Sequence, residues 1–350
     1  MKNFLIYGSY GYTGTLIVEQ AVKQGLRPLL AGRDENQLRS QAEKFGLEYR
    51  AFPLENTAAL DAALQEVEAV LHCAGPFVLT FRQMAEACIR NKKHYVDISG
   101  EIEGFETLAK MDEDAKSAGV MLLPGGGFDV VPSDCLSAYV AGKLASATHL
   151  ELYIKSIGSG VSRGTARSGI ENSHRQGRIR REGKIVSVPN LWDSKDIDFG
   201  RGPTRLVSVG WGDVSTAYHS TGIPNVTVYM SFPPAMINMM RLTRFAGPLL
   251  YTRTARNFIK RLIGKFLPPG PSRRQNENGF SLLIAEVRDS GQMVRAKLQT
   301  PEAYHLTALT SVEIMRRILA SDYRPGFLTP SKAYGADFIL QFSGVTRKDL

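Results

Sequence analysis

Three glycines stand directly after the first predicted strand, and they constrain the fold of this chain more than any other feature. The run Phe4–Tyr7 is apolar, Gly8, Gly11 and Gly14 follow it, and a helical pattern covers 15–24. Glycines in a strand-to-helix turn allow a tight backbone path and let a ligand approach the amides at the helix N-terminus. The spacing is GxxGxxG rather than the commoner GxGxxG, but the strand before it and the helix after it are both present. A nucleotide-binding βαβ unit is therefore predicted, and a glycine-rich turn without a ligand is the alternative.

The predicted ligand of this turn is a dinucleotide whose pyrophosphate meets the main chain of seven residues: Gly8, Ser9, Tyr10, Gly11, Tyr12, Thr13 and Gly14. The second strand ends in Ala31-Gly32-Arg33, where NAD-specific enzymes usually carry a carboxylate for the adenosine ribose. A guanidinium at this place favours a 2′-phosphate, so Arg33 predicts NADP rather than NAD. A solvated arginine before a helix is the alternative reading. The next residue, Asp34, is expected to cap that helix through the Gln37 amide.

Short apolar runs alternate with amphipathic stretches over the first 125 residues, and the predicted strands are 3–7, 28–31, 48–52, 68–72, 93–96 and 120–123. This alternation is typical of an α/β chain with an N-terminal Rossmann domain, a doubly wound parallel sheet, over residues 1–132. A helix near 133–146 and alternating runs then predict a second α+β domain over 133–302, with a mostly antiparallel sheet. Residues 303–350 are predicted to form a helix and tail that return to the first domain.

Two loops should flank the nicotinamide half of the dinucleotide, because ligands of open parallel sheets lie beyond the carboxyl ends of the strands. The fourth strand leads into a loop with four predicted cofactor contacts, Ala74, Gly75, Pro76 and Phe77. The fifth leads into Asp97 and Glu101, which are predicted to contact substrate. A simple turn at Gly75-Pro76, and carboxylates that only order their own loop, are the alternatives.

Composition supports a folded chain without a metal site. Of 350 residues, 43% are hydrophobic and 22% are charged, which is ordinary for a globular protein. No run approaches the roughly 18 apolar residues of a spanning helix. The three cysteines, Cys73, Cys88 and Cys135, have the spacing of neither a metal cluster nor a disulfide framework. A cytoplasmic protein is expected, and no metal is predicted.

The net charge of +9 is concentrated in one stretch. Between Asp213 and Glu277 there is no acidic residue, while nine lysines and arginines occur there. Within 235–267, a helical pattern places Phe258, Ile259, Leu262, Ile263 and Phe266 on one face and Arg253, Arg256, Lys260, Arg261 and Lys265 on the other. Such a helix could rest on an anionic membrane surface, receive an acidic acyl carrier or coenzyme A phosphates, or pack on its own core with a solvated basic face. Nucleic acid is not predicted, since no aromatic platform or known motif accompanies the charge.

The sequence resembles the saccharopine dehydrogenase-like oxidoreductases, and within them the branch that contains the trans-acting enoyl reductases. The likeness rests on six segments: 8–14, 31–33, 73–77, 95–101, 125–134 and 326–335. It implies an NADP-binding Rossmann domain, a second α+β domain inserted before a returning C-terminal segment, and an active site in the cleft between them. It does not fix the substrate, but no set of basic residues suited to the carboxylates of saccharopine stands out, which favours the enoyl reductase branch.

Reduction of an enoyl thioester needs hydrogen-bond donors for the developing enolate and an acid. The loop 125–134 supplies Asp129 and Ser133 as catalytic candidates, with Gly127 and Phe128 beside the substrate, although Asp129 and Ser133 could instead cap the following helix. The loop 158–165 contributes Arg163, with His174 and Arg175 further on, as anion contacts or as solvated residues.

The predicted function is NADPH-dependent reduction of a hydrophobic small-molecule or acyl-carrier-bound substrate. Its rivals are a saccharopine-type dehydrogenase acting on a C–N bond and a catalytically silent, membrane-associated nucleotide-binding scaffold. The sequence leaves the oligomeric state open.

Overall fold

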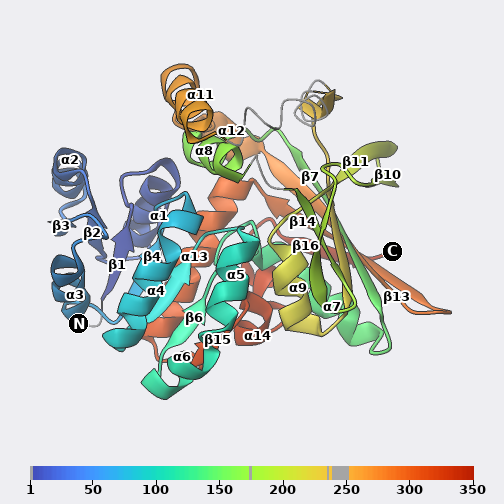
Figure 1. Ribbon diagram of the computed structural model, residues 1–350, viewed down its shortest axis with the longest axis horizontal. Coiled ribbons are helices and arrows are strands. Elements are labelled where there is room, and N and C mark those ends of the chain that lie inside the picture. Colours follow the sequence, from blue (N-terminus) through green and yellow to red (C-terminus); the bar gives the residue numbers. More distant parts are fainter. Residues whose placement is uncertain (1–2, 173–175, 235, 239–251) are drawn as a thin grey trace. The chain divides into compact units, whose positions relative to one another are not determined.

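The computed structural model describes residues 3–172, 176–234, 236–238 and 252–350, which form two compact units (Figure 1). The first unit consists of Met1–Val131 and Tyr304–Ala333, and the second of Pro132–Ala303 and Tyr334–Leu350. The predicted tail 303–350 is thus shared: its helix belongs to the first unit and its last residues belong to the second.

The first unit contains a seven-stranded parallel sheet in the order β15-β6-β5-β4-β1-β2-β3. Its strands are β1 (Phe4–Tyr7), β2 (Leu29–Gly32), β3 (Tyr49–Ala51), β4 (Ala69–His72), β5 (His94–Asp97), β6 (Met121–Leu123) and β15 (Gly326–Phe327). All residues of β1, β2, β4, β5 and β6 are buried. Helices cover both faces of such a sheet, which explains why these strands read as continuous apolar runs. The predicted doubly wound parallel sheet is confirmed.

Helices connect the strands of this sheet. On one face, α3 (Thr57–Gln65), α4 (Phe81–Arg90), α5 (Ile102–Ala109) and α6 (Asp112–Ala118) share a buried apolar cluster with side chains of the central strands. The helix α1 (Tyr12–Lys23) begins three residues before the predicted start and is followed by α2 (Glu35–Phe45). The long helix α13 (Ala303–Leu319) joins α1 through an edge-on contact of Tyr12 with Tyr304, whose ring centroids are 5.1 Å apart.

The second unit is built on a nine-stranded sheet in which β7 and β12 are parallel and the other neighbours are antiparallel. A mostly antiparallel second sheet is therefore confirmed. Its strands are β7 (His149–Ile157), β8 (Gly177–Arg181), β9 (Lys184–Val188), β10 (Ser194–Asp198), β11 (Pro203–Val209), β12 (Asn225–Met230), β13 (Phe280–Arg288), β14 (Met293–Pro301) and β16 (Thr346–Asp349). Strands β13 and β14 form the predicted hairpin, and the Asp289 carboxylate accepts from the amides of Gly291 and Gln292 in its turn.

The helices of the second unit are α7 (Val131–Lys143), α8 (Arg163–Asn172), α9 (Asp213–Thr221), α11 (Arg253–Phe266) and α12 (Arg273–Asn278). Two short helices, α14 (Pro330–Tyr334) and η2 (Phe338–Gln341), precede the last strand, and η1 (Phe77–Leu79) precedes α4 in the first unit. None of the helices within the described ranges is long and apolar enough to cross a membrane. Of the basic stretch predicted over 235–267, residues 235 and 239–251 lie outside the described residues, as do His174 and Arg175.

Candidate functional site

The loop 8–14 after β1 forms a concave main-chain surface, which we call the glycine cradle. It stays open because its glycines have no side chains. Gly8 has a φ of +85°, and its amide donates to the Ala31 carbonyl at 2.7 Å. A Cβ on Gly8 would come within 2.9 Å of the Ala74 nitrogen. A Cβ on Gly14 would lie 2.7 Å from the Ser9 carbonyl oxygen and closer still to that of Gly8. Both positions therefore require glycine, as the sequence motif predicts.

The helix that follows offers its N-terminus to a ligand. Its N-cap residue is Gly11, which has no side chain to satisfy the first amides of α1. The Ser9 hydroxyl is fully buried and has no hydrogen-bond partner within the described part of the chain. The N-terminus of α1 and the buried Ser9 hydroxyl lie beside the glycine cradle and fit the pyrophosphate of a dinucleotide, because main-chain amides and a hydroxyl can donate to an anion.

The end of β2 carries a guanidinium that the protein itself does not use. Arg33 is exposed, and among the described residues it makes no hydrogen bond or ion pair. The neighbouring carboxylate of Asp34 is engaged: it caps α2, accepting from the Gln37 amide at 3.2 Å and from the Gln37 side chain at 2.7 Å. These hydrogen bonds hold the pKa of Asp34 below its usual value. The predicted cap is confirmed, and Arg33 is the group that remains for a phosphate beside the cradle.

The loop after β4 packs against the cradle and is tied to the loop after β5. It contains Ala74, the cis-linked pair Gly75-Pro76, and Phe77. The Glu101 carboxylate accepts from the amides of Phe77 and Val78, with N···O distances of 3.2 and 2.5 Å. Glu101, predicted as a substrate contact, thus orders the loop predicted to contact cofactor.

Asp97 at the end of β5 organises two further loops. Its carboxylate accepts from the Tyr95 hydroxyl at 2.6 Å, the Ser99 amide at 2.9 Å and the Gly125 amide at 2.8 Å. The side chain is 1% exposed. Burial raises the pKa of Asp97, and the three donors oppose that rise. Asp97 therefore connects the loop after β5 with the loop after β6.

The loop after β6 brings Asp129 against the loop after β5. A Cβ built on Gly100 would lie 3.0 Å from Oδ2 of Asp129, so a larger residue there would require the Asp129 side chain to shift. The Asp129 side chain keeps some exposed surface, yet protein atoms surround it closely, and this burial raises its pKa to about 7. A carboxyl group with a pKa of about 7 can change its protonation near neutral pH, which is what proton transfer to a substrate requires.

Two threonines of α13 hold the same loop, and no sequence pattern had indicated them. The Thr307 hydroxyl accepts from the Phe128 amide at 3.0 Å, and the Thr310 hydroxyl donates to the Gly126 carbonyl at 2.9 Å. A Cβ on Gly127 would lie 2.7 Å from the Thr307 methyl carbon. Nearly 180 residues separate the partners, so no local pattern could have indicated the contact. The predicted residues Gly127 and Phe128 are thus fixed by α13.

Two predicted site residues lie in the second unit. Ser133 is buried in the first turn of α7. Arg163 begins α8, where its Nε donates to the Leu267 carbonyl at 2.5 Å and its amide donates to the Pro269 carbonyl at 3.1 Å. Part of the Arg163 guanidinium is therefore used to hold the segment after α11. Catalysis by Ser133 and substrate contact by Arg163 stay predictions.

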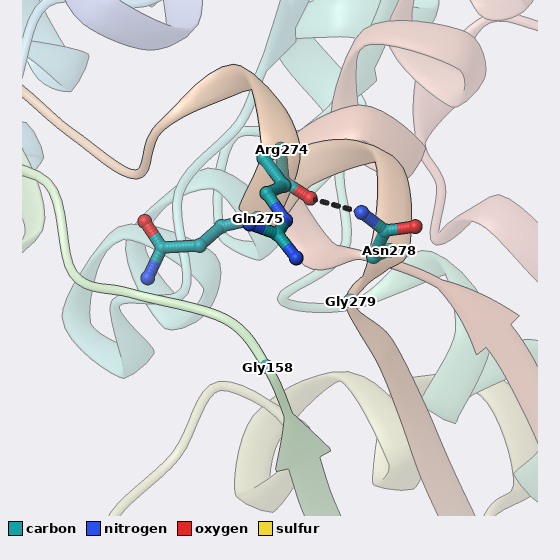
Figure 2. A pocket seen from close by; sticks show the side chains of 5 residues that line it. All are labelled: Gly158, Arg274, Gln275, Asn278 and Gly279. Atoms are coloured by element: carbon teal, nitrogen blue, oxygen red, sulfur yellow. Dashed lines mark hydrogen bonds between the residues drawn. The ribbon is translucent and has the colours of Figure 1, made fainter.

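The second unit also contains a small open pocket of about 340 Å³ beside α12 (Figure 2). Gly158, Arg274, Gln275, Asn278 and Gly279 line it, and the Asn278 amide donates to the Arg274 carbonyl at 3.0 Å. The pocket includes Gly158, the first residue of the loop 158–165 that also contains Arg163. Its volume is near the lower end of ligand-site volumes. Across the described residues, no group of three His, Cys, Asp or Glu side chains is arranged to hold a metal.

Comparison with protein families identifies the first unit. Residues 4–123 match the family model of the saccharopine dehydrogenase NADP binding domain. This segment is therefore similar in sequence to the NADP-binding domain of saccharopine dehydrogenases. The match contains the whole glycine cradle, Arg33 and the loops after β4 and β5, and it confirms the predicted cofactor class.

Relatives of the NADP-binding domain carry the two names that the sequence suggested. The saccharopine dehydrogenase-like oxidoreductase of Homo sapiens is 27% identical over 214 residues, which are 54% of this chain and 49% of that protein. The trans-acting enoyl reductase of Mycobacterium leprae (strain TN) is 27% identical over 140 residues, 38% of this chain and 34% of that protein. The chain thus spans about half the length, or less, of these curated relatives. The predicted resemblance is confirmed.

A solved structure extends the likeness to the whole fold. Apo saccharopine dehydrogenase (L-Glu forming) from Saccharomyces cerevisiae superposes with a TM-score of 0.67 over 100% of both chains, at 13% sequence identity. At this identity, the likeness concerns the fold alone. The second sheet that follows the NADP-binding domain is therefore part of a known architecture.

Proposed function

We propose that the protein is an NADPH-dependent oxidoreductase. The observation that carries this proposal is the unpaired Arg33 guanidinium at the end of β2, next to the glycine cradle of an NADP-binding domain. In this proposal the main chain of 8–14 binds the pyrophosphate and Arg33 binds the 2′-phosphate. The loop 74–77, which Glu101 orders, would hold the nicotinamide half of the cofactor. When bound, NADPH supplies a hydride.

The proposed reaction is reduction of the C=C bond of an enoyl thioester on a hydrophobic chain, free or bound to an acyl carrier. Support comes from the similarity to a protein named trans-acting enoyl reductase and from the raised pKa of Asp129. The bound cofactor would supply the hydride for the β-carbon while the π-electron pair moves toward the thioester oxygen, and the Asp129 carboxyl would deliver its proton to the α-carbon. With a pKa of about 7, Asp129 can both hold this proton and release it near neutral pH. Asp97 and Glu101 act by positioning the loops.

Oxidation of a C–N bond is the second candidate, because the fold is that of a saccharopine dehydrogenase. Amino-acid carboxylates are usually held by arginines that converge on one pocket. The pocket of Figure 2 contains one arginine, Arg274. This pocket therefore adds no support for the second candidate.

Fluorescence titration with NADPH and NADH tests the cofactor assignment. Arg33→Ala should weaken NADPH binding roughly 10- to 150-fold, the value of one charge-assisted hydrogen bond of about 1.5–3 kcal/mol, and leave NADH binding unchanged. Lys23→Ala, which removes an exposed cation at the end of α1, is the matched control and should change neither. Equal affinity of the wild type for the two cofactors would rule out the NADP preference.

A second assay separates the three candidate functions. Medium-chain and long-chain 2-enoyl thioesters should oxidise NADPH in the presence of the protein, and saccharopine should not reduce NADP⁺. The reverse result would establish the C–N dehydrogenase. NADPH binding without turnover of either substrate would favour the silent scaffold.

We also propose that the protein binds its hydrophobic substrate at an anionic surface rather than free in water.

A further inference from the structure

The helix α11 exposes an apolar row that nothing in the described chain covers. Phe258, Leu262 and Phe266 lie four residues apart on one side of this helix and are 60%, 39% and 71% exposed. We call these three residues the α11 stripe. A large apolar side chain is less stable in water than when it is buried. Three of them in one row mark an interaction surface rather than scattered exposure.

The α11 stripe is exposed although the helix itself packs against its own unit. Ala255, Ile259 and Ile263, in the adjacent row, are half-buried, and α11 packs against α8 (Figure 1). The predicted apolar face of the helix is thus divided: one row anchors α11 to its own unit and the α11 stripe remains outside. The alternative of a helix whose whole apolar face packs on the core is wrong for this stripe.

Basic side chains accompany the α11 stripe. Arg261 and Lys265 are exposed in the next row, and the Lys265 ammonium lies 5.6 Å from the centre of the Phe266 ring. No acidic residue occurs in the sequence from 214 to 276. Val161, which is 50% exposed, lies two residues before Arg163, whose Nε donates to the Leu267 carbonyl at the end of α11. The surface is therefore apolar at its centre and positive at its side.

We infer that α11 is an interfacial helix that seats this protein on an anionic lipid surface, with the α11 stripe in the acyl boundary and the cations against the headgroups. The inference does not rest on the proposed reaction. An amphipathic helix with aromatic and leucine side chains beside lysine and arginine binds in this way. A second copy of this chain is disfavoured as the occupant, because a symmetric contact would bring the same cations together. An acidic carrier would pair with the cations but would leave the two phenylalanine rings without a function.

Vesicle flotation of the full chain tests the inference. Phosphatidylcholine vesicles containing roughly one-third phosphatidylserine should carry the wild type upward, and pure phosphatidylcholine vesicles should not. The double variant Phe258→Ser/Phe266→Ser should lower the partition coefficient about tenfold or more. Met293→Ser, which removes a 55% exposed side chain at the β13–β14 hairpin, is the matched control and should bind like the wild type.

The charged row is tested separately. Arg261→Gln/Lys265→Gln should weaken binding to the anionic vesicles roughly 10- to 30-fold, and raised salt should weaken wild-type binding as well. Lys184→Gln/Arg201→Gln, two exposed cations elsewhere in the second unit, should have little effect. Unchanged circular dichroism and unchanged NADPH affinity establish that each variant is folded.

Three results would overturn the inference. The wild type could fail to bind anionic vesicles, with or without binding an acidic acyl carrier. The stripe variant could bind vesicles as well as the Met293→Ser control does. Light scattering could show a wild-type dimer that Phe258→Ser/Phe266→Ser converts to a monomer, which would make the α11 stripe a self-association surface. Failure of the enoyl reductase assay leaves all of these measurements unaffected.

Discussion

Asp129 is a carboxyl group in a place where its charge is unfavourable. It belongs to the loop after β6 and lies against Gly100 of the loop after β5, and burial raises its pKa from 3.8 to about 7. A carboxyl group with an ordinary pKa would be almost fully ionised at neutral pH and would be a poor proton donor. At this position Asp129 can therefore donate a proton near neutral pH, which an exposed aspartate with an ordinary pKa does poorly.

The variant Asp129→Asn tests that chemistry. If Asp129 donates the proton, kcat of the wild type should fall as the pH rises through about 7, because the protonated fraction falls. The asparagine variant should lose roughly 10²- to 10⁴-fold in kcat, together with this pH dependence. Steady-state rates from pH 5 to 9 are the measurement, and Asp114→Asn, an exposed residue of α6, is the control. An Asn variant that keeps the wild-type pH profile would exclude Asp129 as the donor.

A stability measurement on the same variant checks the raised pKa independently of catalysis. Because the folded state binds the Asp129 proton more tightly than the unfolded state, ionisation favours unfolding. From pH 3.8 to about 7 the wild type should progressively lose stability that Asp129→Asn keeps, and the difference should be constant above pH 7. Urea unfolding across this range gives both free energies.

At the scale of elements, α13 is the helix that fixes the candidate site from far along the chain. It contributes Thr307 to the Phe128 amide and Thr310 to the Gly126 carbonyl. Thr307 is 8% exposed and Thr310 is fully buried, so water cannot readily replace either hydroxyl. The loop with Asp129 therefore depends on α13 for its shape.

Thr307→Val should destabilise the protein by about 1–3 kcal/mol, because the buried Phe128 amide loses its acceptor. Ser311→Ala, in the same helix, is the matched control. The Ser311 hydroxyl bonds only to the Thr307 carbonyl, which keeps its helical partner, so this change should cost less than about 0.5 kcal/mol. Urea unfolding gives both values, and equal losses in the two variants would contradict the role of α13.

The features that could be predicted from the sequence are those that depend on residues close together in the chain. Strands β1 to β6, the Asp34 cap and the open space at Gly8 and Gly14 follow from local apolar runs, turn chemistry and spacing. The threonines of α13 were not predicted, since their partners are far away in sequence. The division of the α11 apolar face was missed for a related reason: periodicity identifies the face, but only tertiary packing decides which row is covered.

At the scale of the whole molecule, the nucleotide cradle should stabilise its unit when it is occupied. NADPH at about 100 times its Kd should add about 2.7 kcal/mol to the stability of the first unit, because it binds only the folded state. Differential scanning calorimetry should show one transition that moves with NADPH, and Gly14→Ala should abolish the shift, since its Cβ would overlap the Gly8 carbonyl.

The matched control is Gly142→Ala in α7, where an added Cβ meets nothing within 4 Å. This variant should keep the full NADPH-induced shift. A Gly14→Ala protein that also keeps the shift would place the nucleotide somewhere other than the cradle.

The pairing of β15 with β6, and the hold of α13 on the loop after β6, have a consequence for how the protein is made. A ribosome synthesises the strands around the cradle first, but the helix and edge strand that complete this unit come only with residues 303–327. Until β15 is synthesised, the strands around the cradle therefore form a sheet whose β6 edge is unpaired. The second unit is synthesised during this time. A fragment ending at residue 131 should for this reason be a poor substitute for the intact nucleotide-binding unit, and translation pauses before residue 303 should increase its demand for chaperones.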